Sequence, residues 1–186
     1  KLLRSVFVFV LAFSLVLGTG AFTNVGTINV NAATAQVKIT PNSKTIYVGK
    51  TTKLKVKKKA KKAKLTWKSS NKRVATVNRK GVVKAVGTGN ATITILATSG
   101  VSSTVNVNVV ALNKSELNLR QYDSETLIVH GTANAVTWYS SNTRVAVVTN
   151  GKVVAKGIGT AYIYAYVNGC KLGCQINVTS VNNKNR

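Results

Sequence analysis

Side chains of the types that perform acid, base or nucleophilic chemistry are scarce in this 186-residue chain. They are three acids, one histidine and two cysteines: Glu116, Asp123, Glu125, His130, Cys170 and Cys174. Catalysis by proton transfer or by a metal needs several such groups at one place. One histidine and three scattered acids predict neither a catalytic triad nor a metal site. We therefore expect no enzymatic activity, no cofactor and no metal.

The two cysteines leave two interpretations open. On a continuous strand, residues four positions apart are separated by about 13 Å, beyond the roughly 7 Å between Cα atoms that a disulfide tolerates. This distance favours Cys174 as a buried thiol in the last strand, with Cys170 near a turn. The alternative is a Cys170–Cys174 disulfide, which requires Lys171-Leu172-Gly173 to form a hairpin loop. Asn168-Gly169 is the stronger turn signal, so we favour the buried thiol.

Lysine is the residue type that points most directly to binding. The chain has 27 Lys and Arg against three acids, a net charge of +24. Eight lysines lie within one short segment: Lys53, Lys55, Lys57, Lys58, Lys59, Lys61, Lys62 and Lys64. Lysines act as mobile point charges, so this run predicts a salt-sensitive site of low specificity for an anionic polysaccharide or cell-wall polymer. The alternative is a charged edge that opposes aggregation. We expect no specific nucleic-acid site, because no aromatic residues are interleaved with the lysines.

The chain carries an internal repeat of about 70 residues. Trp67-Lys68-Ser69-Ser70-Asn71 recurs 71 positions later as Trp138-Tyr139-Ser140-Ser141-Asn142, and Gly87-Thr88-Gly89-Asn90-Ala91 recurs 70 positions later as Gly157-Ile158-Gly159-Thr160-Ala161. We therefore predict two domains, at residues 36–110 and 111–179. The lysine run is not repeated, because the second copy has no lysine between Thr126 and Trp138.

Each copy reads as a series of short strands. Apolar residues alternate with polar ones in runs such as 91–96 and 161–167, and Gly, Asn and Ser clusters separate the runs. About seven such strands per copy predict an all-β fold of two tandem antiparallel sandwiches. The serines after each tryptophan are expected to hold a turn. The Gly-x-Gly segments precede strands rather than helices, so we expect a structural turn and no phosphate site.

The order Trp-x-Ser-Ser-Asn, Val-Ala-x-Val, Gly-x-Val-x-Ala and Gly-x-Gly-x-Ala-x-Ile resembles the bacterial immunoglobulin-like domain, group 2, in both copies. The resemblance implies an immunoglobulin-like sandwich without catalytic residues, found in surface and secreted bacterial proteins as a spacer or adhesive module. Trp67 and Trp138 stand where such folds bury a tryptophan. The alternative for each tryptophan is an exposed ring that stacks on a sugar.

The first 35 residues have the layout of a secretory signal peptide. Lys1 and Arg4 precede the apolar run 6–17, whose twelve residues fall short of the roughly 20 that cross a bilayer. Small residues at 30–32 and 33–35 mark two cleavage sites, so we expect the mature chain to begin between Ala33 and Gln36. Membrane contact is expected only transiently, through this segment. Residues 180–186 form a polar tail.

These observations predict a secreted or envelope-associated bacterial binding or adhesion protein. On this hypothesis the first copy contacts anionic polysaccharide through its lysine run, and the protein has carbohydrate-binding character. The alternative is a passive structural spacer that has no ligand of its own. The sequence predicts no particular oligomeric state.

Overall fold

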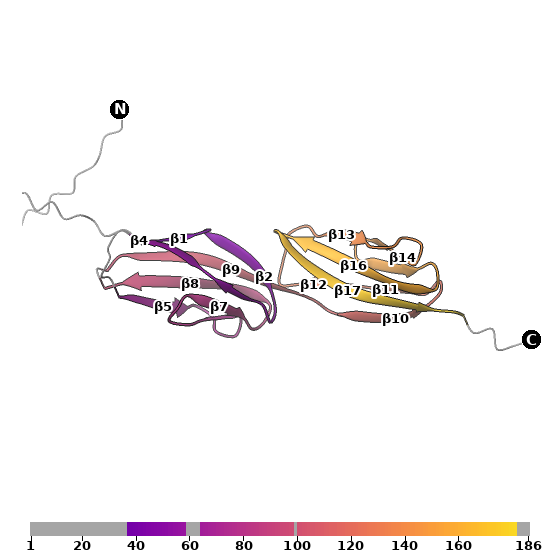
Figure 1. Cartoon of the computed structure of the whole chain (residues 1–186), viewed down its shortest axis with the longest axis horizontal. Helices are drawn as coiled ribbons and strands as arrows, with labels where there is room; N and C mark the ends of the chain where they lie inside the picture. Colours follow the sequence, from indigo (N-terminus) through magenta and orange to yellow (C-terminus); the bar gives the residue numbers. More distant parts are fainter. Residues whose placement is uncertain (1–36, 59–63, 99, 182–186) are drawn as a thin grey trace, which may run out of the picture. The chain divides into compact units, whose positions relative to one another are not determined.

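The computed structural model describes residues 37–58, 64–98 and 100–181 (Figure 1). These residues form strands joined by turns, which confirms the all-β fold class. Since none of the residues in these ranges is helical, no membrane-crossing helix is found there. The predicted signal peptide and residues 182–186 of the polar tail lie outside the described residues.

The first group of strands, which we call sandwich one, forms two layers of β-sheet. The second group, described below, has the same arrangement. Its strands are β1 (Val37–Thr40), β2 (Ser43–Tyr47), β3 (Thr51–Lys53), β4 (Lys55–Lys58), β5 (Leu65–Ser69), β6 (Ala75–Val77), β7 (Val82–Ala85), β8 (Gly89–Ala97) and β9 (Ser102–Leu112). One sheet has the order β2-β9-β8-β5 and the other has the order β3-β7-β6, while β1 pairs with β4. Figure 1 shows β8 between β5 and β9. The core between the sheets includes Ile93, Ile95 and Val107.

The second group, sandwich two, follows directly. Its strands are β10 (Glu116–Arg120), β11 (Ser124–Thr126), β12 (Val129–His130), β13 (Thr137–Ser140), β14 (Ala146–Thr149), β15 (Lys152–Ala155), β16 (Gly159–Val167) and β17 (Cys170–Thr179). The sheets have the orders β10-β17-β16-β13 and β11-β15-β14. A separate core contains Ile163, Cys174 and Ile176.

Strand β9 belongs to both sandwiches. Its last residues, Ala111 and Leu112, pair with β12, just as β1 pairs with β4 in sandwich one. The expected boundary after residue 110 therefore falls inside a continuous strand. The same hydrogen bond precedes this pairing in each sandwich, from Leu54 N–H to the Gly81 carbonyl and from Leu127 N–H to the Gly151 carbonyl. The two copies thus share their topology as well as their sequence motifs.

The sheets are antiparallel apart from one pair in each sandwich. Strand β2 runs parallel to β9, and β10 runs parallel to β17. The antiparallel sandwich that the sequence predicts thus contains one parallel strand pair in each copy. In each sandwich the opening strand of the four-stranded sheet joins the edge of the last strand, and local alternation in the sequence carries no information on the direction of such a distant partner.

Strand burial follows the period-two pattern that the sequence predicts. In β16, Ala161, Ile163 and Ala165 are buried and alternate with residues on the other face. The hairpin to β17 turns at Asn168 and Gly169, whose φ values of +47° and +74° suit the two-residue turn expected for Asn-Gly. This turn sets the β16–β17 register, in which Val167 opposes Cys170.

Candidate polyanion-binding surface

The alternating lysines of the run fall on two strands. Lys53 ends β3, which pairs with β7, and Lys55 and Lys57 lie in β4, which pairs with β1. The partner changes at Leu54, whose side chain is buried. All three lysine side chains are exposed. The run thus spreads positive charge over two pairs of strands instead of one continuous strand.

Strand pairing brings further lysines beside this run. Lys38 of β1 lies directly opposite Lys57, and Lys84 of β7 is the diagonal neighbour of Lys53. Directly opposed side chains have Cβ atoms about 5 Å apart, and like charges in such pairs are destabilising. Sandwich one therefore carries these charges at a cost to its own stability.

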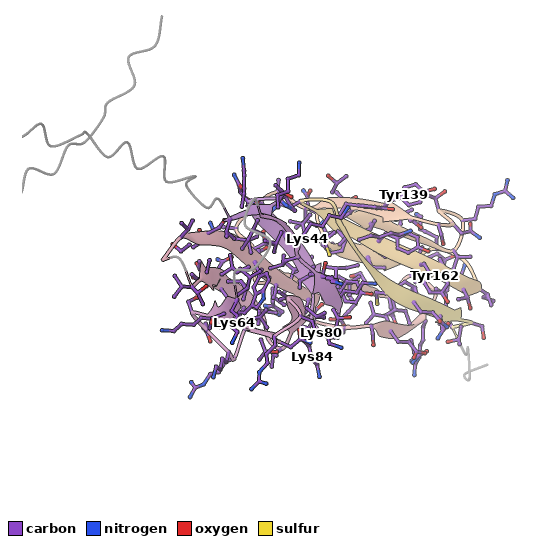
Figure 2. All side chains as sticks on the ribbon, turned by 60° about the vertical axis from the view of Figure 1, so that its left-hand side comes forward. Lys44, Lys64, Lys80, Lys84, Tyr139 and Tyr162 are labelled. Carbon is purple, nitrogen blue, oxygen red and sulfur yellow. The ribbon has the colours of Figure 1, made fainter. Side chains whose placement is uncertain are left out.

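A groove lies beside the run. It has a volume of about 370 Å³ and is lined by Thr40, Pro41, Lys44, Lys53, Leu54 and Lys55. Pro41 and Leu54 give it apolar surface, while three ammonium groups are supplied by β2, β3 and β4. Lys44 was not among the predicted site residues, because it precedes the run in the sequence, and it lines the groove from β2. Figure 2 labels Lys44, with Lys64, Lys80 and Lys84. We define the basic surface by six residues: Lys38, Lys44, Lys53, Lys55, Lys57 and Lys84.

The rest of the predicted run is placed only in part. Lys58 ends β4 and Lys64 is an exposed residue just before β5. Lys59, Lys61 and Lys62 lie outside the described residues. The basic surface therefore contains three of the eight predicted lysines and three that the run does not contain.

No carboxylate neutralises the basic surface. Residues 36–110 contain seventeen basic residues and no acid. Within the described ranges, the one salt bridge joins Lys114 to Glu125, on sandwich two, at 3.1 Å. The six lysines of the basic surface therefore form no salt bridge within the described residues and are available to an external anion.

The second copy provides an internal comparison. At the register positions of Lys53, Lys55 and Lys57 it has Thr126, Ile128 and His130. The same strands form with these residues, so neither folding nor edge pairing requires the lysines.

The Ser-Ser-Asn segments are turn supports, as expected. The buried Ser69 hydroxyl donates to the Ala75 carbonyl at 2.6 Å, and Asn71 N–H donates to Ser69 Oγ at 3.2 Å. Ser140 makes the same 2.6 Å bond to Ala146. With both copies using the hydroxyl in this way, the serine holds the backbone and is not presented as a nucleophile.

The Gly-x-Gly segments are also structural. A Cβ at Gly87 would lie 2.8 Å from the Arg73 carbonyl oxygen, and one at Gly157 would lie 2.7 Å from that of Arg144. Glycine is needed for this close approach of two backbones. The following strands, β8 and β16, enter the cores, in agreement with a turn instead of a phosphate loop.

Trp67 and Trp138 are partly buried and pack against the cores of their sandwiches. Each indole also meets a turn glycine. A Cβ at Gly81 would lie 2.5 Å from Trp67 Cζ2, and one at Gly151 would lie 3.2 Å from Trp138 Cζ2. These contacts place the tryptophans among residues that hold the fold.

Cys170 and Cys174 are free, buried thiols. The disulfide alternative is wrong, because both residues belong to the continuous strand β17 and the hairpin turns earlier, at Asn168-Gly169. Burial raises the pKa of the Cys170 thiol. Burial, with a smaller contribution from the Glu116 carboxylate, raises the pKa of Cys174 to about 11. Both thiols are therefore protonated and unreactive near neutral pH.

The chain is similar to several known proteins in sequence or in structure. An uncharacterized protein of Clostridium acetobutylicum is 30% identical over 207 residues, an alignment that covers 100% of this chain and 21% of the relative. The chain thus spans about a fifth of that protein. The C-terminal fragment of intimin, solved in complex with the translocated intimin receptor, is 18% identical, with 78% of this chain and 64% of that chain covered and a TM-score of 0.45. Domains 4–9 of the surface layer protein SbsC are 17% identical, with 81% and 31% covered and a TM-score of 0.37.

The family comparison is specific to the first copy. Residues 33–109 match the family model of the bacterial Ig-like domain (group 2). This range holds the first tryptophan motif, both glycine motifs of sandwich one and the lysine run. Residues 33–109 are therefore similar to the bacterial Ig-like domain (group 2), the family that the motifs of the first copy resemble.

Proposed function

We propose that the protein is an exported, non-enzymatic binding protein that holds anionic polysaccharide of the cell wall or matrix through the basic surface of sandwich one. The observation that carries this proposal is the group of exposed lysines without carboxylate partners around the groove of β2, β3 and β4. Export rests on the signal-peptide pattern of residues 1–35. Sandwich two, built on the same topology, is proposed to be a second domain of the same family.

The contrast between the copies favours binding over edge protection. Strands β11 and β12 of sandwich two occupy the positions of β3 and β4. They contain no lysine, and β11 has the acidic Glu125. Since sandwich two forms the same edges without lysines, protection against edge pairing does not account for the basic surface.

A polyanion fits this surface better than a small anion does. The lysines of the basic surface lie on five strands and are exposed to solvent, so they suit a chain with charges at intervals. Binding of this kind is driven by many weak contacts and falls steeply with ionic strength. The groove adds apolar contact through Pro41 and Leu54, which suits a sugar ring next to a carboxylate or phosphate group.

The test is retention of the full chain on an immobilised anionic polysaccharide, such as polygalacturonate, at low and high NaCl concentration. We expect retention at low salt that is lost at high salt. The triple variant Lys53→Ser, Lys55→Ser, Lys57→Ser should elute at markedly lower salt.

The matched control removes the same charge elsewhere on sandwich one. Lys68→Ser, Lys72→Ser, Lys80→Ser also deletes three exposed lysines, but these lie outside the basic surface. It should elute close to the unmodified protein. If both triple variants lose retention equally, the protein is attracted to the polysaccharide by its overall charge and not through a defined site. If the unmodified protein is not retained at all, the result favours a passive spacer.

A further inference from the structure

A row of tyrosines lies on the outward face of the four-stranded sheet of sandwich two. Tyr162, Tyr164 and Tyr166 alternate with buried residues along β16, and Tyr139 of β13 lies directly opposite Tyr164. The side chains of Tyr139, Tyr162 and Tyr166 are 58%, 43% and 39% exposed. Figure 2 labels Tyr139 and Tyr162. We call these four residues the tyrosine row.

The rings are arranged in parallel around Tyr164. The Tyr139 and Tyr164 ring centroids are 6.5 Å apart with 10° between the planes, and those of Tyr162 and Tyr164 are 6.1 Å apart with 9° between the planes. Three rings of the row, those of Tyr139, Tyr162 and Tyr164, are therefore nearly parallel to one another.

The central ring is held in place by its neighbours on β17. Gly173 lies opposite Tyr164, and a Cβ there would be 3.4 Å from two of the ring carbons. The Lys171 ammonium lies 3.6 Å from the Tyr164 ring centroid, within the range of a strong cation–π contact. Tyr164 thus acts as a support, while the flanking rings of Tyr139 and Tyr162 remain more open to solvent.

A row of polar groups runs beside the rings. Tyr162 Oη donates to Gln175 Oε1 at 3.0 Å, and Gln175 Nε2 donates to Asn177 Oδ1 at 3.0 Å. Asn177 Nδ2 in turn donates to Glu116 and Asn118, at 2.7 and 3.0 Å. Asn177 is fully engaged, because its Oδ1 also accepts from Thr160 Oγ1 at 3.2 Å. Gln175 keeps spare donor and acceptor capacity on the same face, as recognition of hydroxyl groups requires.

The fold does not need the tyrosines. At the register positions of Tyr139, Tyr162 and Tyr164, sandwich one has Lys68, Thr92 and Thr94, and the sheet forms in the same way. Cross-strand aromatic pairs contribute only about 0.2–1 kcal/mol each. The amide positions are shared, since Asn106 and Asn108 correspond to Gln175 and Asn177. The aromatic residues are the feature that distinguishes the second copy.

We infer that the tyrosine row and its amides bind a neutral polysaccharide whose pyranose rings stack on the exposed aromatic faces. The C–H groups of a pyranose face carry slight positive charge and are attracted to the negative face of an aromatic ring. The sugar hydroxyls then meet the amide row. This second site binds through ring stacking and hydrogen bonds, whereas the basic surface binds through charge. The second site therefore does not depend on the basic surface.

Charge and area select this occupant. Among the described residues of this face there are two cations, Lys171, which is engaged with Tyr164, and Arg120 at the end of β10, against one carboxylate, Glu116. The net charge of the face is therefore small beside that of the six lysines of the basic surface, and its attraction to a polyanion is weak. The three exposed rings together present roughly 300 Å² of surface, estimated from about 200 Å² per tyrosine. A stable protein interface buries about 800 Å² on each partner. A single polysaccharide chain therefore fits the row better than a second protein does.

The experiment measures depletion of the full chain from solution by insoluble chitin, cellulose and β-1,3-glucan. It is done in about 1 M NaCl, where the Debye length is about 3 Å and binding through lysines is suppressed. We expect retention on at least one of these polysaccharides. Tyr162→Thr, which introduces the residue of sandwich one, and Tyr139→Thr should each lower the binding constant about tenfold.

Two controls separate this site from others. Tyr122→Ala removes a tyrosine that is 73% exposed but lies outside the row, and it should bind normally. The triple lysine variant of sandwich one should also bind normally in high salt, so failure of the basic surface would leave this result intact. The inference is overturned if no neutral polysaccharide retains the protein, if the row variants bind as well as the unmodified chain, or if those variants only abolish self-association in sedimentation.

Discussion

At the scale of single residues, the polar side chains of the repeat motifs are committed to backbone support. Ser69 and Ser140 each bond a carbonyl six residues further on, and Asn71 and Asn142 accept from the N–H groups of Arg73 and Arg144. Residues that occur twice, in the same register and with the same bonds, serve what the two copies share, which is the fold. Recognition is therefore to be sought in residues that differ between the copies.

Cys174 leads to a prediction on the pH dependence of stability. Its pKa is raised to about 11, so the folded state keeps the proton more firmly than the unfolded chain, whose thiol has the ordinary value of 9.0. Stability is therefore unaffected below about pH 9 and declines as the pH rises from 9 toward 11. We expect sandwich two to lose about 1–3 kcal/mol in this interval through Cys174.

The measurement is urea unfolding of the unmodified chain and of Cys174→Val at several pH values. Sandwich one has Val105 at this position, 1% exposed, so valine suits the site. The two proteins share every other titratable group, so the difference between their pH profiles isolates the Cys174 thiol. Equal slopes for the two proteins, with Cys174→Ala agreeing, would contradict the prediction.

At the scale of elements, sequence and structure agree where interactions are local. Alternation identified β8 and β16, and Asn168-Gly169 identified the last hairpin. The pairing between strands distant in sequence could not be predicted from the sequence, because the alternation of polar and apolar residues does not indicate which sheet edge a strand joins. Polar and apolar residues also alternate in the segment 52–56, as in a single strand, but the segment changes its pairing partner at Leu54. The neighbours Lys38 and Lys84, the groove residue Lys44, and the alignment of Tyr139 with Tyr164 all follow from that long-range pairing. The alternation of Tyr162, Tyr164 and Tyr166 was the one signal of the tyrosine row visible in the sequence.

The turn between β6 and β7 supplies a prediction at this scale. Gly81 has a φ of +72° and faces the Trp67 indole, at 2.5 Å from a built Cβ. Gly81→Ala combines the strain of a positive φ with displacement of a rigid ring, and we expect it to destabilise sandwich one by about 2–4 kcal/mol. Urea unfolding followed by Trp67 fluorescence in a Trp138→Phe background measures the effect.

Gly49 is the matched control for this turn. It has a φ of +87° and no atom within 4 Å of a built Cβ, so Gly49→Ala introduces strain without a contact. We expect it to cost about 1 kcal/mol. Equal effects at the two glycines would mean that the indole contact contributes nothing.

At the scale of the whole molecule, the two sandwiches have separate cores and very different charge. The basic residues of 36–110 repel one another without any internal carboxylate, whereas sandwich two has three acids among its charges. Self-repulsion destabilises a compact state and is screened by salt. The asymmetry suits a protein in which one module engages charged polymers and the other neutral ones.

This asymmetry leads to a prediction on salt. Raising NaCl from about 10 mM to about 150 mM shortens the Debye length from about 30 Å to about 8 Å, and should raise the urea midpoint of sandwich one more than that of sandwich two. Each sandwich has one tryptophan, so Trp138→Phe and Trp67→Phe variants report on them separately.

In low salt, Lys57→Ser should stabilise sandwich one by about 0.5 kcal/mol, because it removes the like-charge pair with Lys38. The gain should vanish at high salt, and His130→Ser, opposite Ala111, should show no salt-dependent effect on sandwich two. If Lys57→Ser is neutral or destabilising at low salt, repulsion between these lysines does not lower the stability of sandwich one. The argument that the lysines are kept for a ligand, despite a cost in stability, would then be contradicted.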